Sequence, residues 1–145
     1  MMMLVKNWVY VMSSSMTHYI IATHGKLAKG FEDTVSLLTQ KQDMHSITAY
    51  IDDEFPSNLT ALMEGFSEAD NVVVFTDLTC GSVTQKIMEL YGYRDNLHIF
   101  AGVNLSLILE VMLSEQLPNE EYCNSVVESA KDQICYLHNV YETRE

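Results

Sequence analysis

Four short runs of apolar, largely β-branched residues alternate with segments of helical spacing, and this alternation restricts the fold more than any other feature of the chain. The runs are residues 18–23, 45–51, 71–76 and 97–103. Such runs are typical of strands buried on both faces, as in a parallel sheet. Parallel strands are joined by right-handed crossovers. We therefore predict an α/β fold, a three-layer doubly wound sheet of four mainly parallel strands in an order of about 2-1-3-4.

The segments between the runs predict amphipathic helices. Ser57 and Asn104 are suitable caps for the second and fourth helix, because a short polar side chain can accept a hydrogen bond from a free backbone N–H. After Pro118 a polar helix is expected over residues 119–131. Residues 134–141 then alternate loosely, which predicts a C-terminal edge or exchanged strand that needs a pairing partner. The buried face of the first helix is expected to carry Leu27, Phe31, Val35 and Leu38.

Charge and cysteine content exclude several classes of partner and site. The formal net charge is −12, so the surface repels nucleic acid and anionic lipid and favours a basic protein partner. The three cysteines form no CxxC motif and cannot all pair, which indicates a reducing compartment without a disulfide framework or zinc finger. No apolar run reaches the roughly 18 residues that a membrane span needs.

The first fifteen residues are distinct from the rest of the chain. Their short apolar patch is interrupted by Lys6 and Asn7, and no small-residue cleavage site follows, so a signal peptide is a poor interpretation. We expect residues 1–15 to be a disordered or non-native extension and residues 16–145 to form a single domain.

Polar residues follow two of the predicted strands. In open α/β sheets, functional groups lie beyond the carboxyl ends of the strands, where the strand order reverses. His24 follows the first strand and Asp77 the third, so a 2-1-3-4 order places them opposite each other. A carboxylate that accepts the proton of one ring nitrogen leaves the other nitrogen free and nucleophilic.

Two helix starts complete this candidate site. His24 lies at the start of a helix, whose positive dipole end keeps the imidazole neutral. Gly81 and Ser82 open another helix, whose free N–H groups suit a phosphoryl group. Together with Asp77, these features predict a histidine that accepts a phosphoryl group.

Simpler interpretations exist for each residue. A histidine beside a strand is often a packing residue, and Asp77 could merely end its strand. The other four histidines lie in or at the edges of predicted strands and are interpreted as structural, and residues 52–53 as a solvated turn. The segment from Cys80 to Lys86 has the spacing of a phosphatase Cys-x5-Arg loop, but lysine replaces the required arginine.

Three segments resemble, in order and spacing, the IIA component of the mannose–fructose–sorbose family of the sugar phosphotransferase system (PTS): IIATHGKLAKGF, VVVFTDLTCGS and AGVNLSLILE. The likeness runs from residue 16 to about residue 114 and more loosely beyond. It implies a cytoplasmic phosphotransferase that takes phosphate from HPr as phosphohistidine and passes it to a IIB domain, for sugar uptake through the membrane components IIC and IID. It also implies a homodimer that exchanges a C-terminal strand, and neither metal nor cofactor.

By position, the resemblance makes His24 the phosphorylated residue and Asp77 its orienting carboxylate. The loop after Asp77 departs from the family pattern, in which Gly-Gly-Ser and often Pro follow a hydrophobic pair. Cys80 replaces the first glycine, which would strain a backbone with positive φ, and Thr79 replaces an apolar residue expected at the partner interface. The phosphoryl site would be lined by Thr23, Gly25, Gly81 and Ser82.

Two alternative functions stay open. A regulatory or sensor module could keep the fold and His24 while reporting the phosphorylation state of the PTS; genes for IIB, IIC and IID nearby would favour the carrier instead. The phosphoryl donor subunit of a dihydroxyacetone kinase shares the fold, but tends to have a serine-rich turn where this chain has Thr23-His24-Gly25.

Overall fold

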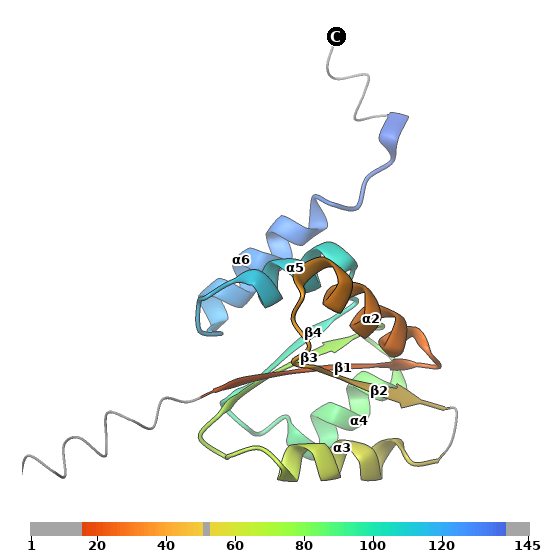
Figure 1. Ribbon diagram of the computed structural model, residues 1–145, viewed down its shortest axis with the longest axis vertical. Helices are drawn as coiled ribbons and strands as arrows, with labels where there is room; N and C mark the ends of the chain where they lie inside the picture. The colour runs from red at the N-terminus through yellow and green to blue at the C-terminus, as the bar shows by residue number, and fades with distance from the viewer. Residues whose placement is uncertain (1–15, 51–52, 139–145) are drawn as a thin grey trace, which may run out of the picture.

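The computed structural model describes residues 16–50 and 53–138, and within them the four predicted strands form one parallel sheet (Figure 1). The strands are β1 (Thr17–His24), β2 (Met44–Ala49), β3 (Asn71–Thr76) and β4 (Leu97–Ala101). They lie in the order β2-β1-β3-β4, and each neighbouring pair is parallel. The predicted fold class and strand order are confirmed. The strand order reverses between β1 and β3, whose carboxyl ends therefore flank the expected site.

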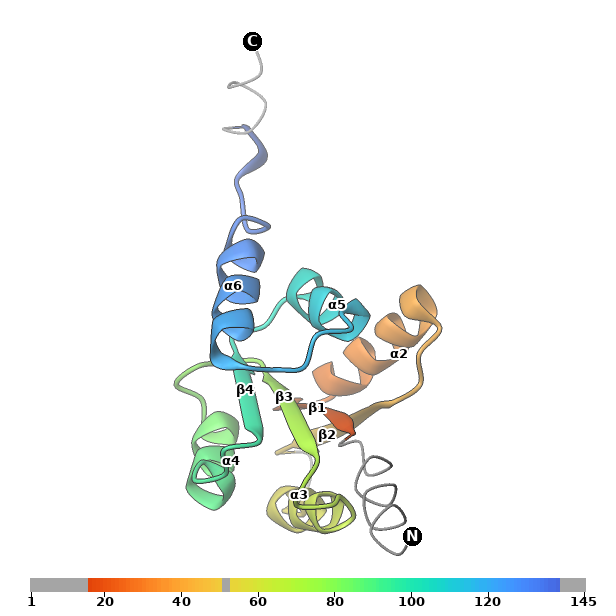
Figure 2. The same cartoon turned by 90° about the vertical axis from the view of Figure 1, so that its left-hand side faces the viewer.

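Helices cover both faces of this sheet (Figures 1 and 2). One face carries α3 (Phe55–Glu64) and α4 (Ser82–Tyr91), and the other carries α2 (Leu27–Thr39), α5 (Leu105–Leu113) and α6 (Glu120–Lys131). No helix in the described part of the chain is long and apolar enough to cross a membrane.

Alternate strand residues fill two cores, one on each face of the sheet. Phe75 of β3 packs in the core with α2, α5 and α6, and its neighbour Val74 packs in the core with α3 and α4. Both side chains are fully buried, which stabilises the fold by about 1.5–3 kcal/mol for each of them. Because successive side chains point to opposite faces, a strand covered on both faces reads as a continuous apolar run.

The buried face of α2 differs from the predicted one. Ala28 and Val35 are buried and Phe31 is partly buried, whereas Leu27 and Leu38 are exposed. The helix meets the sheet through positions 28, 31 and 35, which share one face of a helix. The spacing is therefore right, but the face is rotated relative to the prediction.

The two predicted caps have different outcomes. Asn104 caps α5 as expected, and its side chain accepts a hydrogen bond from the N–H of Leu107 at 2.9 Å. Ser57 is not a cap, because α3 begins at Phe55 with Pro56 in its first turn. Proline suits that place, since its φ is helical and its missing N–H would have no partner there.

The described part of the predicted C-terminal edge strand, residues 134–138, forms no strand within one chain. These residues lead away from the sheet beyond α6 (Figure 2). Residues 139–141 lie outside the described residues, as do residues 1–15 of the expected extension. Exchange requires a second chain, so the exchanged strand stays a prediction.

Candidate functional site

His24 and Asp77 lie side by side where β1 and β3 end. His24 is the last residue of β1, and Asp77 directly follows β3. A single oxygen of Asp77, Oδ2, accepts hydrogen bonds from the backbone N–H of His24 at 2.9 Å and from its ring Nδ1 at 2.8 Å. The carboxylate thus fixes both the backbone and the ring of the histidine.

These contacts define the chemical state of the pair. An ionised carboxylate only accepts hydrogen bonds, so Nδ1 carries the ring proton and Nε2 keeps its lone pair. Burial raises the pKa of the Asp77 carboxyl, but hydrogen bonds from the backbone and ring of His24 outweigh burial, and the pKa lies below its ordinary value. The His24 side chain is 37% exposed, against 12% for Asp77. The nitrogen with the free lone pair therefore belongs to an accessible ring that is hydrogen-bonded to a largely buried carboxylate.

The turn between β1 and α2 holds the histidine in place. Gly25 has a φ of 59°, in the left-handed region that favours glycine, and its N–H donates to the carbonyl of Ala49 at 2.9 Å. Thr23 is fully buried, and its hydroxyl accepts a hydrogen bond from the N–H of Ala28 at 2.7 Å. The Thr23 side chain is thus committed to the first turn of α2.

The start of α4 lies against the imidazole. Gly81 is the N-cap of α4, with an extended backbone and no side-chain cap, and Ser82 is the first helical residue. A Cβ atom on Gly81 would lie 3.2 Å from Cε1 of His24. The first N–H groups of a helix have no partner within it and favour an anion. The structure therefore places the start of α4, where a helix favours negative charge, beside the ring of His24.

Thr84 anchors the loop that carries Asp77. Its hydroxyl donates to the carbonyl of Leu78 at 2.6 Å and is hydrogen-bonded to the hydroxyl of Thr76 at 2.8 Å. Both threonines are buried. Buried hydrogen bonds whose partners are all satisfied make a segment rigid, so the loop holds the carboxylate of Asp77 in place beside His24.

The sequence matches the model of the EIIA-man family, described as PTS system fructose IIA component, over residues 18–130. The chain belongs to this family. Membership supports a phosphotransfer role in a sugar PTS. A protein from Klebsiella pneumoniae, described as a phosphoenolpyruvate-dependent sugar PTS permease, is 30% identical; the match covers 89% of this chain and 96% of that one, with a TM-score of 0.79.

Two other solved structures share the EIIA-man fold at lower identity. The PTS IIA protein associated with the fucose utilization operon of Streptococcus pneumoniae is 19% identical, covers 90% of this chain and 99% of its own, and has a TM-score of 0.75. The mannose/sorbose specific IIA subunit from Enterococcus faecalis is 18% identical, with 83% and 94% coverage and a TM-score of 0.70. These two show the fold alone.

The EIIA-man loop of this chain accepts Cys80 without backbone strain. Among the described residues other than glycine, positive φ occurs only at Gln40 and Tyr50, so Cys80 has an ordinary backbone. Its thiol is free and exposed, and Thr79 is exposed as well. Within residues 16–50 and 53–138, no three His, Cys, Asp or Glu residues are grouped so as to hold a metal ion.

Sequence reasoning misses two features of this region. The ring of Tyr50, directly after β2, stacks on His24 with 5.2 Å between centroids and 16° between planes. A second pair, His18 and Asp70, joins the opposite ends of β1 and β3, with 2.8 Å between Nε2 and Oδ2. The sequence does indicate this pair. Asp70 stands directly before the third apolar run, just as Asp77 stands directly after it, and His18 begins the first run.

Proposed function

We propose that this EIIA-man protein is a cytoplasmic phosphoryl carrier, in which Nε2 of His24 accepts a phosphoryl group from phospho-HPr and passes it to a IIB domain for sugar uptake. The proposal rests chiefly on the two hydrogen bonds from His24 to Oδ2 of Asp77. They leave Nε2 as a free nucleophile on a ring of fixed orientation. Phosphoryl transfer requires positioning of the reacting groups and stabilisation of charge, and this arrangement provides both.

The transfer balances without an external acid or base. The lone pair of Nε2 attacks phosphorus, the new P–N bond forms, and the bond to the donor's ring nitrogen breaks with its electron pair returning to that ring. The donor's imidazolium becomes a neutral imidazole, and the ring of His24 gains the positive charge. Ionised Asp77, hydrogen-bonded at Nδ1, stabilises that charge. The second transfer, to a nucleophile of the IIB domain, repeats these steps with His24 as the donor.

The phosphoryl oxygens would lie at the start of α4. Ser82, the first residue of α4, supplies a backbone N–H group beside the ring of His24, where negative charge is favoured, whereas the N–H of Gly81 donates to the carbonyl of Leu78 at 3.2 Å. Gly25, directly after His24, leaves open space, since no atom lies within 4 Å of the place its Cβ would occupy. Thr23 contributes by holding the first turn of α2. No metal or cofactor takes part in the proposed step.

The partner proteins would dock around His24. Three large apolar side chains from adjacent segments are exposed there: Leu27 at 50%, Tyr50 at 62% and Leu78 at 57%. Exposed apolar side chains around a polar centre favour a protein interface. The net charge of −12 favours partners with basic residues near their own reacting group. HPr and the IIB domain would use this face in turn, and IIC and IID would carry the sugar across the membrane.

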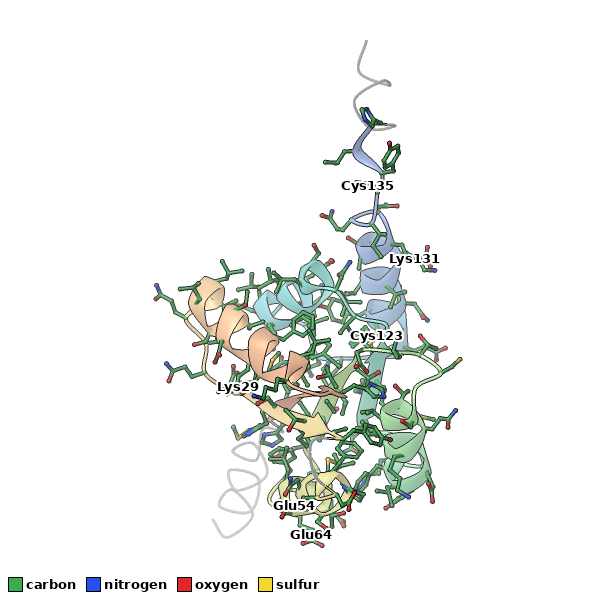
Figure 3. The ribbon with its side chains drawn as sticks, turned by 90° about the vertical axis from the view of Figure 1, so that its right-hand side faces the viewer. Lys29, Glu54, Glu64, Cys123, Lys131 and Cys135 are labelled. Atoms are coloured by element: carbon green, nitrogen blue, oxygen red, sulfur yellow. The ribbon has the colours of Figure 1, made fainter. Side chains whose placement is uncertain are left out.

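The proposal includes a homodimer formed through the C-terminal segment. Ile134, Tyr136 and Leu137 follow α6 and are all more than half exposed, and Figure 3 draws Cys135 of this segment far from the sheet. An exchanged strand would bury these apolar side chains against a second chain. Light scattering on a size-exclusion column should give twice the chain mass of 16.5 kDa, and truncation after Lys131 should give the single mass. A full-length chain of single mass would contradict the dimer.

Intact-protein mass spectrometry tests the carrier function. The protein is mixed with enzyme I, HPr and phosphoenolpyruvate, and its mass is measured at neutral pH and after acid. We expect a gain of about 80 Da that acid removes, because a phosphorylated histidine is acid-labile. His24→Ala should prevent this gain, and the matched control His18→Ala, whose ring is also paired with an aspartate, should retain it.

The outcomes separate the elements of the proposal. Labelling of His24→Ala would reject the site, and no gain in the wild type beside a working control carrier would reject the function. A labelled protein that never passes the group to a IIB domain would favour the sensor module.

A further inference from the structure

The backbone of Tyr50 adopts a conformation that its own side chain disfavours. Its φ is 65°, in the left-handed region that is rare for bulky residues. The residue directly follows β2, whose last carbonyl, at Ala49, accepts the N–H of Gly25. The end of β2 is thus tied to the turn that follows His24, and the strand ends just before the left-handed backbone of Tyr50.

The side chain of Tyr50 gains little burial from this backbone. It is 62% exposed, so core packing does not account for its position. Its contact is with His24, at 5.2 Å between ring centroids and 16° between planes, within the range of favourable offset stacking. Tyr50 also lines a pocket of about 360 Å³ between α3 and α4, which Ser82 at the start of α4 lines as well.

The ring of Tyr50 completes the set of contacts around the imidazole. Asp77 holds the Nδ1 side, and the backbone at Gly81 lies against Cε1. Tyr50 covers one flat face of the ring. A phosphorylated ring with a proton on Nδ1 is cationic, and the face of an aromatic ring attracts a cation. Loss of the phosphoryl group removes this positive charge from the ring, so the stack favours the phosphorylated state.

We propose that Tyr50 is a positioning residue that holds the His24 ring by stacking and protects the phosphorylated ring from hydrolysis. This inference rests on the proposed function of His24. The reaction it retards is the attack of a water oxygen on phosphorus. In that step the P–Nε2 bond breaks, its electron pair returns to the ring and inorganic phosphate leaves.

Two substitutions separate the stack from the backbone. Tyr50→Phe keeps the aromatic face, whereas Tyr50→Asn removes it and suits positive φ, because asparagine tolerates the left-handed region. Gln40→Asn is the matched control: Gln40 also has positive φ, at 60°, and lies at the far end of α2. This substitution relieves the same kind of backbone strain as Tyr50→Asn, but at a position outside the site.

The first measurement needs no phosphorylation. In the unphosphorylated protein, the NMR signal of the His24 Cε1 proton reports the ring current of Tyr50. Tyr50→Asn should move this signal downfield, while Tyr50→Phe and Gln40→Asn should leave it close to the wild-type position. An unmoved signal in Tyr50→Asn would show that the rings do not stack in solution, and would overturn the inference.

The second measurement is the half-life of the phosphorylated protein after removal of the donor, followed by intact mass. We expect Tyr50→Asn to shorten the half-life roughly fivefold, as loss of one aromatic contact with a cation implies, without lowering the thermal midpoint. Tyr50→Phe and Gln40→Asn should match the wild type. Equal half-lives in Tyr50→Asn and Tyr50→Phe would overturn the role of Tyr50 and leave the carrier function standing. A wild type that takes up no phosphoryl group would overturn both.

Discussion

The two ends of β1 carry the same kind of histidine–aspartate hydrogen bond in different surroundings. At the start of the strand, Nε2 of His18 lies 2.8 Å from Oδ2 of Asp70, and at its end Nδ1 of His24 lies 2.8 Å from Oδ2 of Asp77. The ring of His18 stacks flat on Phe66, with 3.9 Å between centroids and 5° between planes. Its side chain is 17% exposed, against 37% for His24.

The two aspartates also use their oxygens differently. Asp70 accepts from the N–H of Met16 with Oδ1 and from His18 with Oδ2. Asp77 gathers both of its bonds from His24 on Oδ2, and its Oδ1 is buried without a hydrogen-bond partner among the described residues. The first pair fastens two segments of the sheet together. A histidine–aspartate contact is therefore no evidence of chemistry by itself; the accessible ring and the adjoining helix start set the second pair apart.

Neutralising each aspartate in turn is the strongest test of this difference. Asp77→Asn removes the negative charge that stabilises a cationic phosphorylated ring and no longer enforces the proton on Nδ1. We expect the rate of phosphoryl uptake to fall by about 10²-fold. Asp70→Asn should keep the rate within about twofold, because its contacts lie at the opposite end of the sheet and positioning of His24 is unchanged. Rapid quenching followed by mass measurement gives both rates.

Circular dichroism controls for folding in the two variants. A similar loss of rate in Asp70→Asn and Asp77→Asn, with both folded, would mean that the pairs act alike.

Filling the space beside the reactive ring should have the next largest effect. A Cβ atom on Gly81 would lie 3.2 Å from Cε1 of His24 and 3.0 Å from Cβ of Leu78, so Gly81→Ala must displace the ring or the loop. We expect uptake to slow about tenfold, because small misplacements of a reacting group are costly in rate. The measurement is the same rapid-quench assay.

The control for this change is Gly30→Ala in α2. Nothing lies within 4 Å of the Cβ position at Gly30, so alanine should stabilise the helix by about 0.5–1 kcal/mol without changing the rate. An unchanged rate in Gly81→Ala would show that the close approach to His24 is not required.

The fold can be predicted wherever the sheet is covered on both faces. The apolar run 71–76 coincides with β3 residue for residue, because residues 72–76 are buried and residues 72–75 alternate between the two cores. Prediction fails where one residue departs from regular backbone geometry. It also fails where packing against neighbouring elements decides which face of a helix is buried. The second run is expected to continue to Ile51, yet β2 ends at Ala49 because Tyr50 has positive φ. Leu38 has suitable spacing for the core but is 57% exposed.

The site can be predicted as far as strand topology determines it. The contact between His24 and Asp77 follows from the order of β1 and β3, and the capping bond of Asn104 from its residue type. The stacking of Tyr50 depends on a backbone angle that bulky residues rarely adopt, so no propensity indicates it. The effect of Cys80 cannot be predicted either, because a cysteine strains the loop only if φ at position 80 is positive, and the residue type does not reveal that angle.

Acid should weaken the fold through both pairs. Hydrogen bonds with His18 lower the pKa of Asp70, and hydrogen bonds from His24 outweigh burial and lower that of Asp77, each from 3.8. A carboxyl whose pKa is lower in the folded state stabilises the protein above its ordinary pKa and loses this effect as pH falls through the folded value. We therefore expect the urea midpoint to drop between pH 5 and about pH 3, and to drop less in either Asp→Asn variant. Equal drops in wild type and variants would mean that neither carboxylate contributes.

The smallest effect is expected from restoring the residue type that the family pattern has in the loop. Cys80 has an ordinary φ and an exposed thiol, so Cys80→Gly relieves no strain and removes no buried contact. It adds only backbone freedom beside Gly81, and we expect the rate of phosphoryl uptake to stay within about twofold and stability to fall by about 0.5–1 kcal/mol. A large gain in rate would mean that the cysteine holds the loop away from the geometry that transfer requires. The end of β1 at His24 would then differ from the end at His18 in two ways: by its exposed ring, and by a loop that sets the rate of phosphoryl uptake.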